Sequence, residues 1–226
     1  MTRKEGFCPD TEMLVEFSAG VLGPAESICV SAHLHFCSKC REALLQLDQL
    51  GSKFLADSKC AEVGTTSFDD VMKEIKFLDE LPKEDRAFTE DRASTKLHFA
   101  PVVDRLMKFN LESLDWKKLS SSVDTARLET GQDRFEVSLH KICAGGKAPV
   151  HDHQGLEYTV VLKGSFSDER SVYREGDFIL RKPGQPHQPI GAQNGECICL
   201  SAQSAPIKLT GPFGFIMNRW LQIHPR

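Results

Sequence analysis

Apolar residues in the first third of the chain recur at the spacing of amphipathic helices. In TEMLVEFSAG, Met13, Leu14 and Phe17 fall on one helical face, and Gly20 is a stop signal. Pro24 suits the first position of a second helix, which the pattern continues to about residue 47. The apolar stripe of this second helix consists of Ile28, Ala32, Cys40, Leu44 and Leu47.

A third helix is predicted over residues 67–81, SFDDVMKEIKFLDEL, where Ser67 can cap the N-terminus. Its apolar stripe consists of Phe68, Val71, Met72, Ile75 and Leu78. This stripe either docks on its own helical bundle or binds a partner, and the pattern leaves both alternatives open. The charged run PKEDRAFTEDRAST that follows has no apolar period. We therefore predict a helical domain over residues 1–86 and a linker over residues 87–96.

Beyond the linker the pattern changes to short runs of β-forming residues. RFEVSLHKI, YTVVLKGSFSD, SVYREGDFIL and CICLSAQ are alternating or continuously apolar, and Gly, Pro and Asp residues separate them. Such runs are typical of a β-sandwich or barrel. The sequence therefore predicts two domains, a small α-helical one and an all-β one over residues 97–226.

Composition narrows the classes of function. The 226 residues are 40% hydrophobic and 27% charged, and the formal net charge is −4. An acidic chain without a basic recognition helix is not expected to bind nucleic acid directly. The first residues lack the apolar core of a secretory signal, and no run approaches the ~20 apolar residues of a membrane helix. We expect a cytoplasmic protein, where eight cysteines are metal ligands, redox thiols or core residues.

The segment HLHFCSKC concentrates metal-binding side chains. His33, Cys37 and Cys40 have the spacing H-x3-C-x2-C, and on a helix residues i, i+4 and i+7 share one face. Zinc takes four thiolate or imidazole ligands, and Cys8, just before the first helix, is the natural fourth. His35 is turned away from this face. The alternative is that the cysteines are small hydrophobic core residues.

The pattern Cys8 … His33-x3-Cys37-x2-Cys40, in front of LLQLDQL, resembles the zinc-binding anti-sigma domain. In that family, short helices around one zinc ion clamp an extracytoplasmic-function sigma factor and block its access to RNA polymerase. The resemblance implies that Cys8, His33, Cys37 and Cys40 are the four zinc ligands. It also implies a sigma factor as partner, for which the stripe on residues 67–81 is the candidate binding surface.

A second ligand pattern lies in GGKAPVHDHQGLEYTVVLKG, which reads G-x5-H-x-H-x3-E-x6-G. His151 and His153 alternate on a strand and project to the same side, with Glu157 an even step away. The downstream segment REGDFILRKPGQPHQPIG adds His187. Three histidines and a carboxylate can hold a divalent metal such as zinc, iron, manganese or nickel.

Both segments resemble the two motifs of the cupin fold, a double-stranded β-helix or jelly-roll barrel. Matched residue by residue, the resemblance implies His151, His153, Glu157 and His187 as metal ligands. In the second motif Pro183 stands one place late and Gly191 replaces the usual Asn, departures that concern turns and not ligands. The alternative is a cupin barrel that retains its turns and binds no metal.

A zinc-binding anti-sigma domain followed by a single cupin resembles the ChrR family. The resemblance implies an anti-sigma factor that releases its sigma factor under oxidative stress, such as singlet oxygen or an organic peroxide. Members of this family often have histidine where this chain has Cys8. We hypothesise that oxidation forms a disulfide from Cys8 to Cys37 or Cys40 and expels the zinc. The alternative is that Cys8 is only a ligand and that a small molecule or oxidant acts at the cupin.

The competing class is a metal-dependent cupin enzyme of the dioxygenase kind, with the helical part as an oligomerisation arm. Cupin metal sites of this composition do occur in enzymes, and fold alone does not decide function. However, no catalytic residue stands out beside the metal ligands, and an oligomerisation arm does not require four zinc ligands. The sequence therefore favours a regulator over an enzyme.

Overall fold

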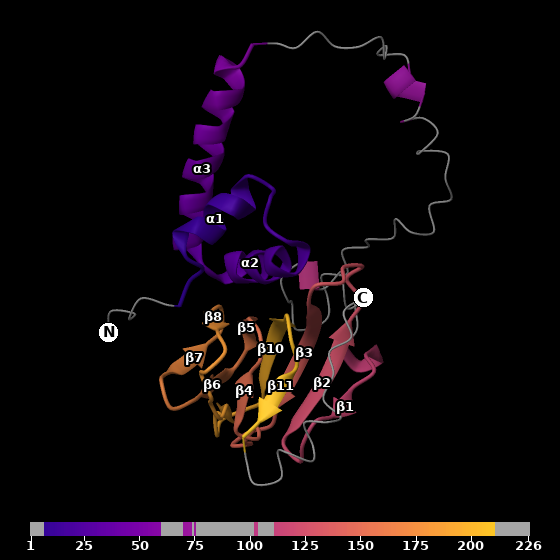
Figure 1. The fold of residues 1–226 in the computed structure, drawn as a ribbon, viewed down its shortest axis with the longest axis vertical. Helices are drawn as coiled ribbons and strands as arrows, with labels where there is room; N and C mark the ends of the chain where they lie inside the picture. Colours follow the sequence, from indigo (N-terminus) through magenta and orange to yellow (C-terminus); the bar gives the residue numbers. More distant parts are fainter. Residues whose placement is uncertain (1–6, 60–69, 74, 76–101, 104–110, 211–226) are drawn as a thin grey trace. The chain divides into compact units, whose positions relative to one another are not determined.

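The computed structural model describes residues 7–59, 70–73, 75, 102–103 and 111–210 (Figure 1). The chain divides into two compact units, residues 1–51 together with 98–226, and residues 52–97. The N-terminal helical residues up to Gly51 thus belong to the same unit as the β-strands. Within the described residues, no helix has both the length and the apolar character that a membrane crossing requires.

Within described residues 7–59, three helices form the N-terminal region: α1 (Thr11–Ser18), α2 (Pro24–Phe36) and α3 (Ser38–Asp57). The side chain of Asp10 caps α1 by accepting from the N–H of Met13 at 2.8 Å. Gly20, with φ of 70°, follows the end of this helix, and Pro24 begins α2, as predicted.

The second predicted helix is wrong in one respect, because it is not continuous. The backbone of Cys37 is extended, with φ −102° and ψ 103°, and separates α2 from α3. The side chain of Cys37 accepts hydrogen bonds from the backbone N–H groups of Lys39 and Cys40. Cys37 therefore caps a new helix instead of continuing the old one, which an apolar period cannot reveal.

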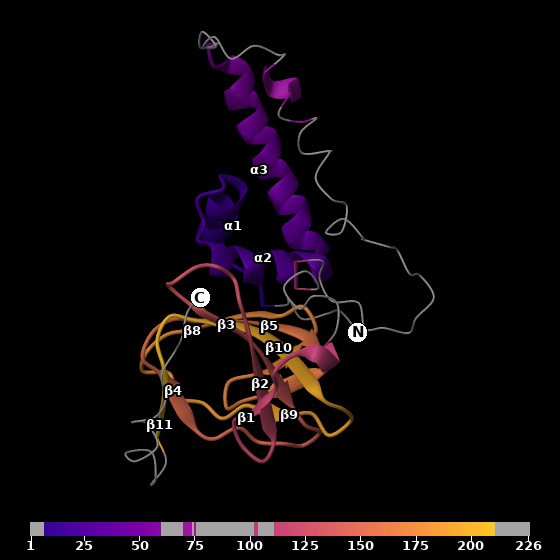
Figure 2. The ribbon, with the colours of Figure 1, turned by 90° about the vertical axis from the view of Figure 1, so that its right-hand side faces the viewer.

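The described strands of the β domain form three antiparallel sheets (Figures 1 and 2). The main sheet has the order β1-β2-β3-β10-β5-β8, and two smaller sheets have the orders β11-β4 and β7-β6-β9. A short 3-10 helix at Leu111–Ser113 precedes them. The strands are β1 (Lys117–Lys118), β2 (Val123–Leu128), β3 (Glu136–Ile142), β4 (His151–His153), β5 (Glu157–Lys163), β6 (Ser165–Ser167), β7 (Val172–Arg174), β8 (Phe178–Arg181), β9 (Ile190–Gly191), β10 (Cys197–Gln203) and β11 (Ile207–Leu209).

Both faces of the main sheet are buried. On β5, Tyr158, Val160 and Leu162 join the core that includes the helices. Val161 joins a second core inside the sandwich, and Glu157 lines a cavity on that side. Because side chains alternate along a strand, this two-sided burial explains why YTVVL is continuously apolar.

Helix α2 covers the outer face of the main sheet, where it packs against β5, β8 and β10 (Figure 2). Its residues Ala25, Cys29, Val30 and Ala32 are fully buried. Small side chains on this face allow the helix to lie close to the strands. The helical region is therefore joined to the β domain through a shared hydrophobic core.

The predicted fold class is confirmed as a helical N-terminal region followed by a cupin-like β-sandwich, although the described strands do not close into a barrel. The four predicted strand segments contain β3, β5 to β8 and β10. In the third predicted helix, residues 70–73 and 75 are helical. The predicted linker and both domain boundaries lie outside the described residues and stay predictions.

Candidate metal centres

The structure brings four predicted ligands together where the three helices meet. Cys8 precedes α1, His33 lies in the last turn of α2, Cys37 separates α2 from α3, and Cys40 lies in the first turn of α3. One donor atom from each of these residues lies within 4.8 Å of the others. This set of four residues is called the Cys/His cluster below. The cluster therefore lies where α1, α2 and α3 come together.

The spacing of the cluster is compatible with zinc. Two sulfurs bound to one tetrahedral zinc at about 2.3 Å lie about 3.8 Å apart. The Sγ atoms of Cys8 and Cys37 are 3.9 Å apart. Within the described part of the chain, the Nε2 atom of the buried His33 ring has no hydrogen-bond partner. A metal ion would satisfy this nitrogen, so the residues present fit the predicted group.

The pKa values of the three thiols indicate that the cluster is more stable with a bound cation. Burial raises the pKa of Cys8 and of Cys40, and each thiol is further affected by its neighbours in the cluster. Burial also raises the pKa of Cys37, but hydrogen bonds from the backbone N–H of Cys40, with the thiols of Cys40 and Cys8, and from the backbone N–H of Lys39 together more than offset this and leave the pKa below its ordinary value. Three thiolates at this distance repel one another, and a bound cation would remove that cost.

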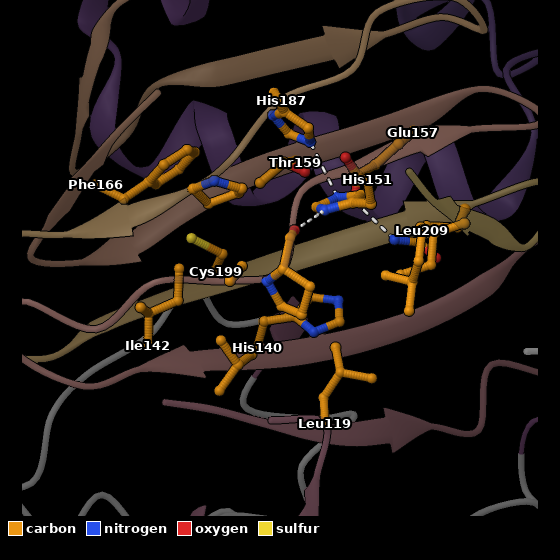
Figure 3. A pocket seen from close by; sticks show the side chains of 16 residues that line it. Leu119, His140, Ile142, His151, Glu157, Thr159, Phe166, His187, Cys199 and Leu209 are labelled. Carbon is orange, nitrogen blue, oxygen red and sulfur yellow. Dashed lines mark hydrogen bonds between the residues drawn. The ribbon is translucent and has the colours of Figure 1, made fainter. Parts of the chain in front are cut away.

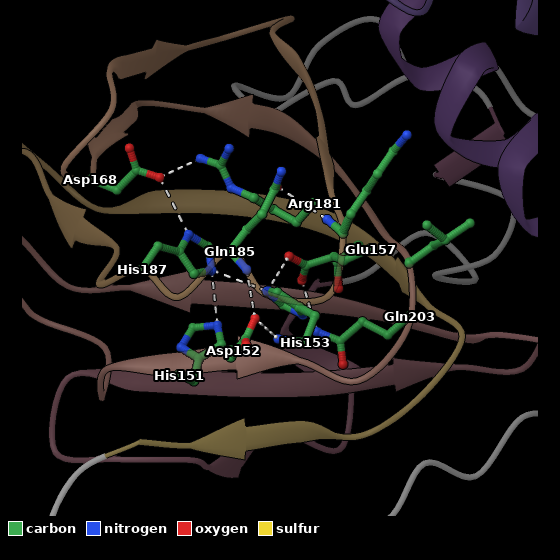
Figure 4. A network of polar contacts seen from close by, with 12 residues as sticks. His151, Asp152, His153, Glu157, Asp168, Arg181, Gln185, His187 and Gln203 are labelled. Carbon is green, nitrogen blue, oxygen red and sulfur yellow. Dashed lines mark hydrogen bonds and ion pairs between the residues drawn. The ribbon is translucent and has the colours of Figure 1, made fainter.

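The second predicted set converges inside the β-sandwich (Figure 4). His151 and His153 lie on β4, and His187 precedes β9. The Nε2 atom of His187 is 3.1 Å from the Nε2 atoms of both other histidines. Glu157, at the start of β5, places a carboxylate oxygen 3.1 Å from Nε2 of His153. These four residues are called the three-histidine site below.

The distances between these donor atoms fit three ligands on one face of an octahedral metal ion. Nitrogens about 2.1 Å from one metal and at right angles to each other lie about 3.0 Å apart. Burial lowers the pKa of His151, and it lowers the pKa of His187 to about 4, so both rings are neutral near pH 7. Burial opposes ionisation of Glu157, yet the neighbouring histidines and Gln203 lower its pKa to about 2. Neutral imidazoles and an ionised carboxylate are the forms that bind metal.

Several residues that support this site were missed by the sequence analysis. Asp168 places Oδ2 3.3 Å from Nδ1 of His187 and also pairs with the guanidinium of Arg181. Gln203 donates to the other oxygen of Glu157 at 2.8 Å. The carbonyl of Pro149 accepts from Nδ1 of His151 at 2.8 Å. These partners occupy the outer nitrogens of His151 and His187 and the second oxygen of Glu157, which directs their remaining atoms inward.

A cavity of about 110 Å³ adjoins the three-histidine site (Figure 3). Most of its wall is apolar, including Leu119, Ile142, Phe166 and Leu209. His140, which the sequence left unassigned, lines the wall and pairs with Ser201 at 2.7 Å. The site therefore combines a set of metal-binding atoms with space for a small apolar molecule.

The predicted partner-binding stripe is described in part. Val71 and Ile75 are 47% and 45% exposed, and Met72 is partly buried. Val71 and Ile75 are one helical turn apart and share a face. Phe68 and Leu78 lie outside the described residues.

The fold and its two sites define a class: a helical Cys/His region joined to a cupin-like β-sandwich with a three-histidine site. Comparison with known proteins agrees with this. A family model described as the ChrR cupin-like domain matches residues 105–206. The anti-sigma-E factor ChrR of Cereibacter sphaeroides is 31% identical over 196 residues, which are 87% of this chain and 88% of that protein.

A solved structure is also similar to this chain over most of the length of this chain. It is a chain from the crystal structure of Rhodobacter sphaeroides SigE in complex with the anti-sigma factor ChrR. The TM-score is 0.71 at 29% identity, and the match covers 88% of this chain and 100% of that chain. This chain therefore belongs to the ChrR family of anti-sigma factors, which confirms the resemblance noted in the sequence.

Replacing Cys37 should remove metal from the Cys/His cluster alone. We expect Cys37→Ser to bind one metal ion fewer per chain and to lose helical signal, because metal binding stabilises so small a helical unit. Metal content by mass spectrometry and circular dichroism would measure both. The matched control is Cys143→Ser, an exposed cysteine outside the cluster. Equal metal content in both variants would contradict the assignment.

Replacing His153 should empty the three-histidine site and leave the Cys/His cluster loaded. Loss of a ligand should weaken metal binding by more than the roughly 10–100-fold effect of losing a ligand's hydrogen-bond partner. His140→Ala is the control, because His140 lines the same cavity but points its Nε2 at Ser201. Competition with a chromophoric chelator would measure both variants. The assignment fails if the two substitutions weaken binding equally.

Proposed function

We propose that this chain binds and inhibits an extracytoplasmic-function sigma factor. The observation that carries the proposal is the likeness, over 88% of this chain, to a chain from the SigE–ChrR complex. Family membership supports a regulatory role in transcription and not an enzymatic one. A sigma factor acts in the cytoplasm, so we place the protein there.

We propose zinc as the metal of the Cys/His cluster. Three thiolates and one imidazole are ligands that zinc prefers, and four-ligand sites of this kind are structural. The ligands come from α2, α3 and the segment before α1, so one ion would fix all three helices. Loss of the ion would release the arrangement that a partner recognises.

The surface that meets the sigma factor includes α3. Leu44 and Leu47 of this helix pack against the core, but the same stripe continues to Leu50 and Phe54. These two side chains are 49% and 67% exposed. Exposed apolar residues in helical register are the usual means by which one helix binds another protein.

The predicted stripe on residues 67–81 is proposed as a second contact. Val71 and Ile75 are exposed on one helical face. With Phe68, Met72 and Leu78 they would form an apolar strip of about three turns. The stripe on α3 and the stripe on residues 67–81 are close in the sequence. Together they would offer a partner a larger apolar surface than either stripe alone.

The three-histidine site is proposed to hold a divalent metal and to receive the signal. Zinc, iron, manganese and nickel all suit three imidazoles and a carboxylate, so the donor set does not select among them. The adjoining cavity could admit a small molecule or an oxidant. Oxidative stress, such as singlet oxygen or an organic peroxide, is the proposed stimulus for release.

A thiol switch at Cys8 is a second proposed route for the signal. The thiolate of Cys37 would attack a peroxide oxygen, giving a sulfenic acid and an alcohol. The thiolate of Cys8 would then attack the sulfenic sulfur and form the disulfide, and the displaced hydroxide would take a proton from the solvent and leave as water. Their Sγ atoms are 3.9 Å apart, so little movement is needed.

The exposed face of α3 can be tested with the full-length chain as bait in an extract of the native organism. The retained sigma factor is identified by mass spectrometry, purified, and titrated against the variants. We expect Leu50→Asp and Phe54→Asp each to weaken binding by about 2 kcal/mol or more, the scale of an interface hot spot. Val172→Asp is the control, since Val172 on β7 is also 49% exposed. Retention of no sigma factor would contradict the proposed function.

The thiol switch predicts different behaviour for two replacements of Cys8. Cys8→His preserves a zinc ligand but removes a thiol, so it should bind the sigma factor and release it more slowly under a peroxide. Cys8→Ser should weaken zinc binding even without an oxidant. Release is followed by fluorescence anisotropy of a labelled sigma factor. Release from Cys8→His as fast as from the native chain would exclude the switch and leave the cupin as the route.

A further inference from the structure

The turn between β7 and β8 touches the Cys/His cluster directly. His33 donates from Nδ1 to the carbonyl oxygen of Gly176, at 2.6 Å. A carbonyl oxygen only accepts hydrogen bonds, so this ring nitrogen carries the proton. Nε2 is therefore the nitrogen left to bind a metal. A backbone group of the β domain thus sets the tautomer and the orientation of a ligand in the helical region.

The same turn also holds the chain beside two other ligands. The N–H of Phe178 donates to the carbonyl of Phe7 at 2.8 Å, and the N–H of Phe7 donates to Asp177 at 3.3 Å. Phe7 immediately precedes Cys8. Phe36, which immediately precedes Cys37, lies so close to Gly176 that a Cβ at position 176 would be 2.5 Å from the Cβ of Phe36.

Strand β8 runs from this turn to the three-histidine site. Its last residue, Arg181, is buried and pairs with Asp168, which contacts His187. Arg181 also lies opposite Glu157 in the register of β8 with β5. One end of a four-residue strand therefore contacts the Cys/His cluster and the other supports the three-histidine site. The strand spans about 13 Å and is held along its length by β5.

We propose that β8 couples the two metal centres: the turn at Gly176 positions His33 and Cys8, and Asp168 with Arg181 positions His187 at the far end. A change in the three-histidine site would then alter the metal affinity of the Cys/His cluster. This inference deepens the proposed function, because it gives the cupin a route to the clamp. Metal binding itself can be measured without a sigma factor, so the two can fail separately.

The test uses the full-length chain and cobalt(II) as the probe. Cobalt bound to thiolates has a sulfur-to-cobalt charge-transfer band, which the three-histidine site cannot produce, so a titration of this band reports the Cys/His cluster alone. We expect Gly176→Ala to weaken cobalt binding at the cluster by about 10–100-fold. The control is Gly131→Ala, because Gly131 has a similar φ of 69° but open space around it.

A second variant tests the far end of the strand. We expect Asp168→Asn, which touches no residue of the cluster, to change cobalt affinity at the cluster by about fivefold or more. Asp133→Asn makes the same charge change at an exposed turn and should have no effect. A native band shape at saturation shows that the cluster has formed in each variant. Unchanged cluster affinity in Asp168→Asn, with weaker metal binding at the three-histidine site, would overturn the coupling.

Unchanged affinity in Gly176→Ala would overturn the role of the turn. Nitrogen-15 shifts of the His33 ring provide an independent readout. The native chain should show a protonated Nδ1 in the zinc-loaded form, and Gly176→Ala should shift this resonance because its acceptor has moved. A Nδ1 resonance that is the same in both proteins would contradict the proposal. Sigma-factor binding enters none of these measurements.

Discussion

The N-terminal region depends on holding four metal-binding atoms at one point. Cys8, His33, Cys37 and Cys40 come from three separate segments, and their donor atoms lie within 4.8 Å of one another. Burial and mutual repulsion of the thiolates oppose this arrangement unless a cation is present. Because α1 and α2 are short, 8 and 13 residues, they have little stability of their own. The geometry of the proposed partner-binding surface therefore rests on this cluster and on the face of the β-sheet beneath α2.

The β domain supports the Cys/His cluster, because α2 packs on its main sheet. Both faces of its main sheet are buried, one by α2 and the other by the interior of the sandwich. The interior face carries the three-histidine site, so the two centres lie on opposite sides of the same sheet. Alternation along β5 makes this possible, since Tyr158 faces the helices and Glu157 faces the cavity. A change on one face therefore has only a single layer of strands to cross.

Local spacing predicted which metal-binding side chains lie together, but it missed the residues that support them. H-x3-C-x2-C and H-x-H-x3-E are short patterns, and the structure gathers all their members. Even so, the helical argument for Cys37 was wrong in its geometry, because this residue breaks the helix and caps the next one. Asp168 and Gly176 were missed because their partners, His187 and His33, are 19 and 143 residues away. No periodicity encodes such contacts, which arise only when strands pair across the fold.

Native mass spectrometry of the full-length chain bound to its sigma factor, before and after treatment with a zinc chelator, tests directly whether the metal of the Cys/His cluster holds the two proteins together. We expect a complex of one chain and one sigma factor whose mass includes the metal of the Cys/His cluster. Removal of that ion should separate the two proteins. A complex that remains intact after the cluster has lost its metal would show that the helices form the clamp without it.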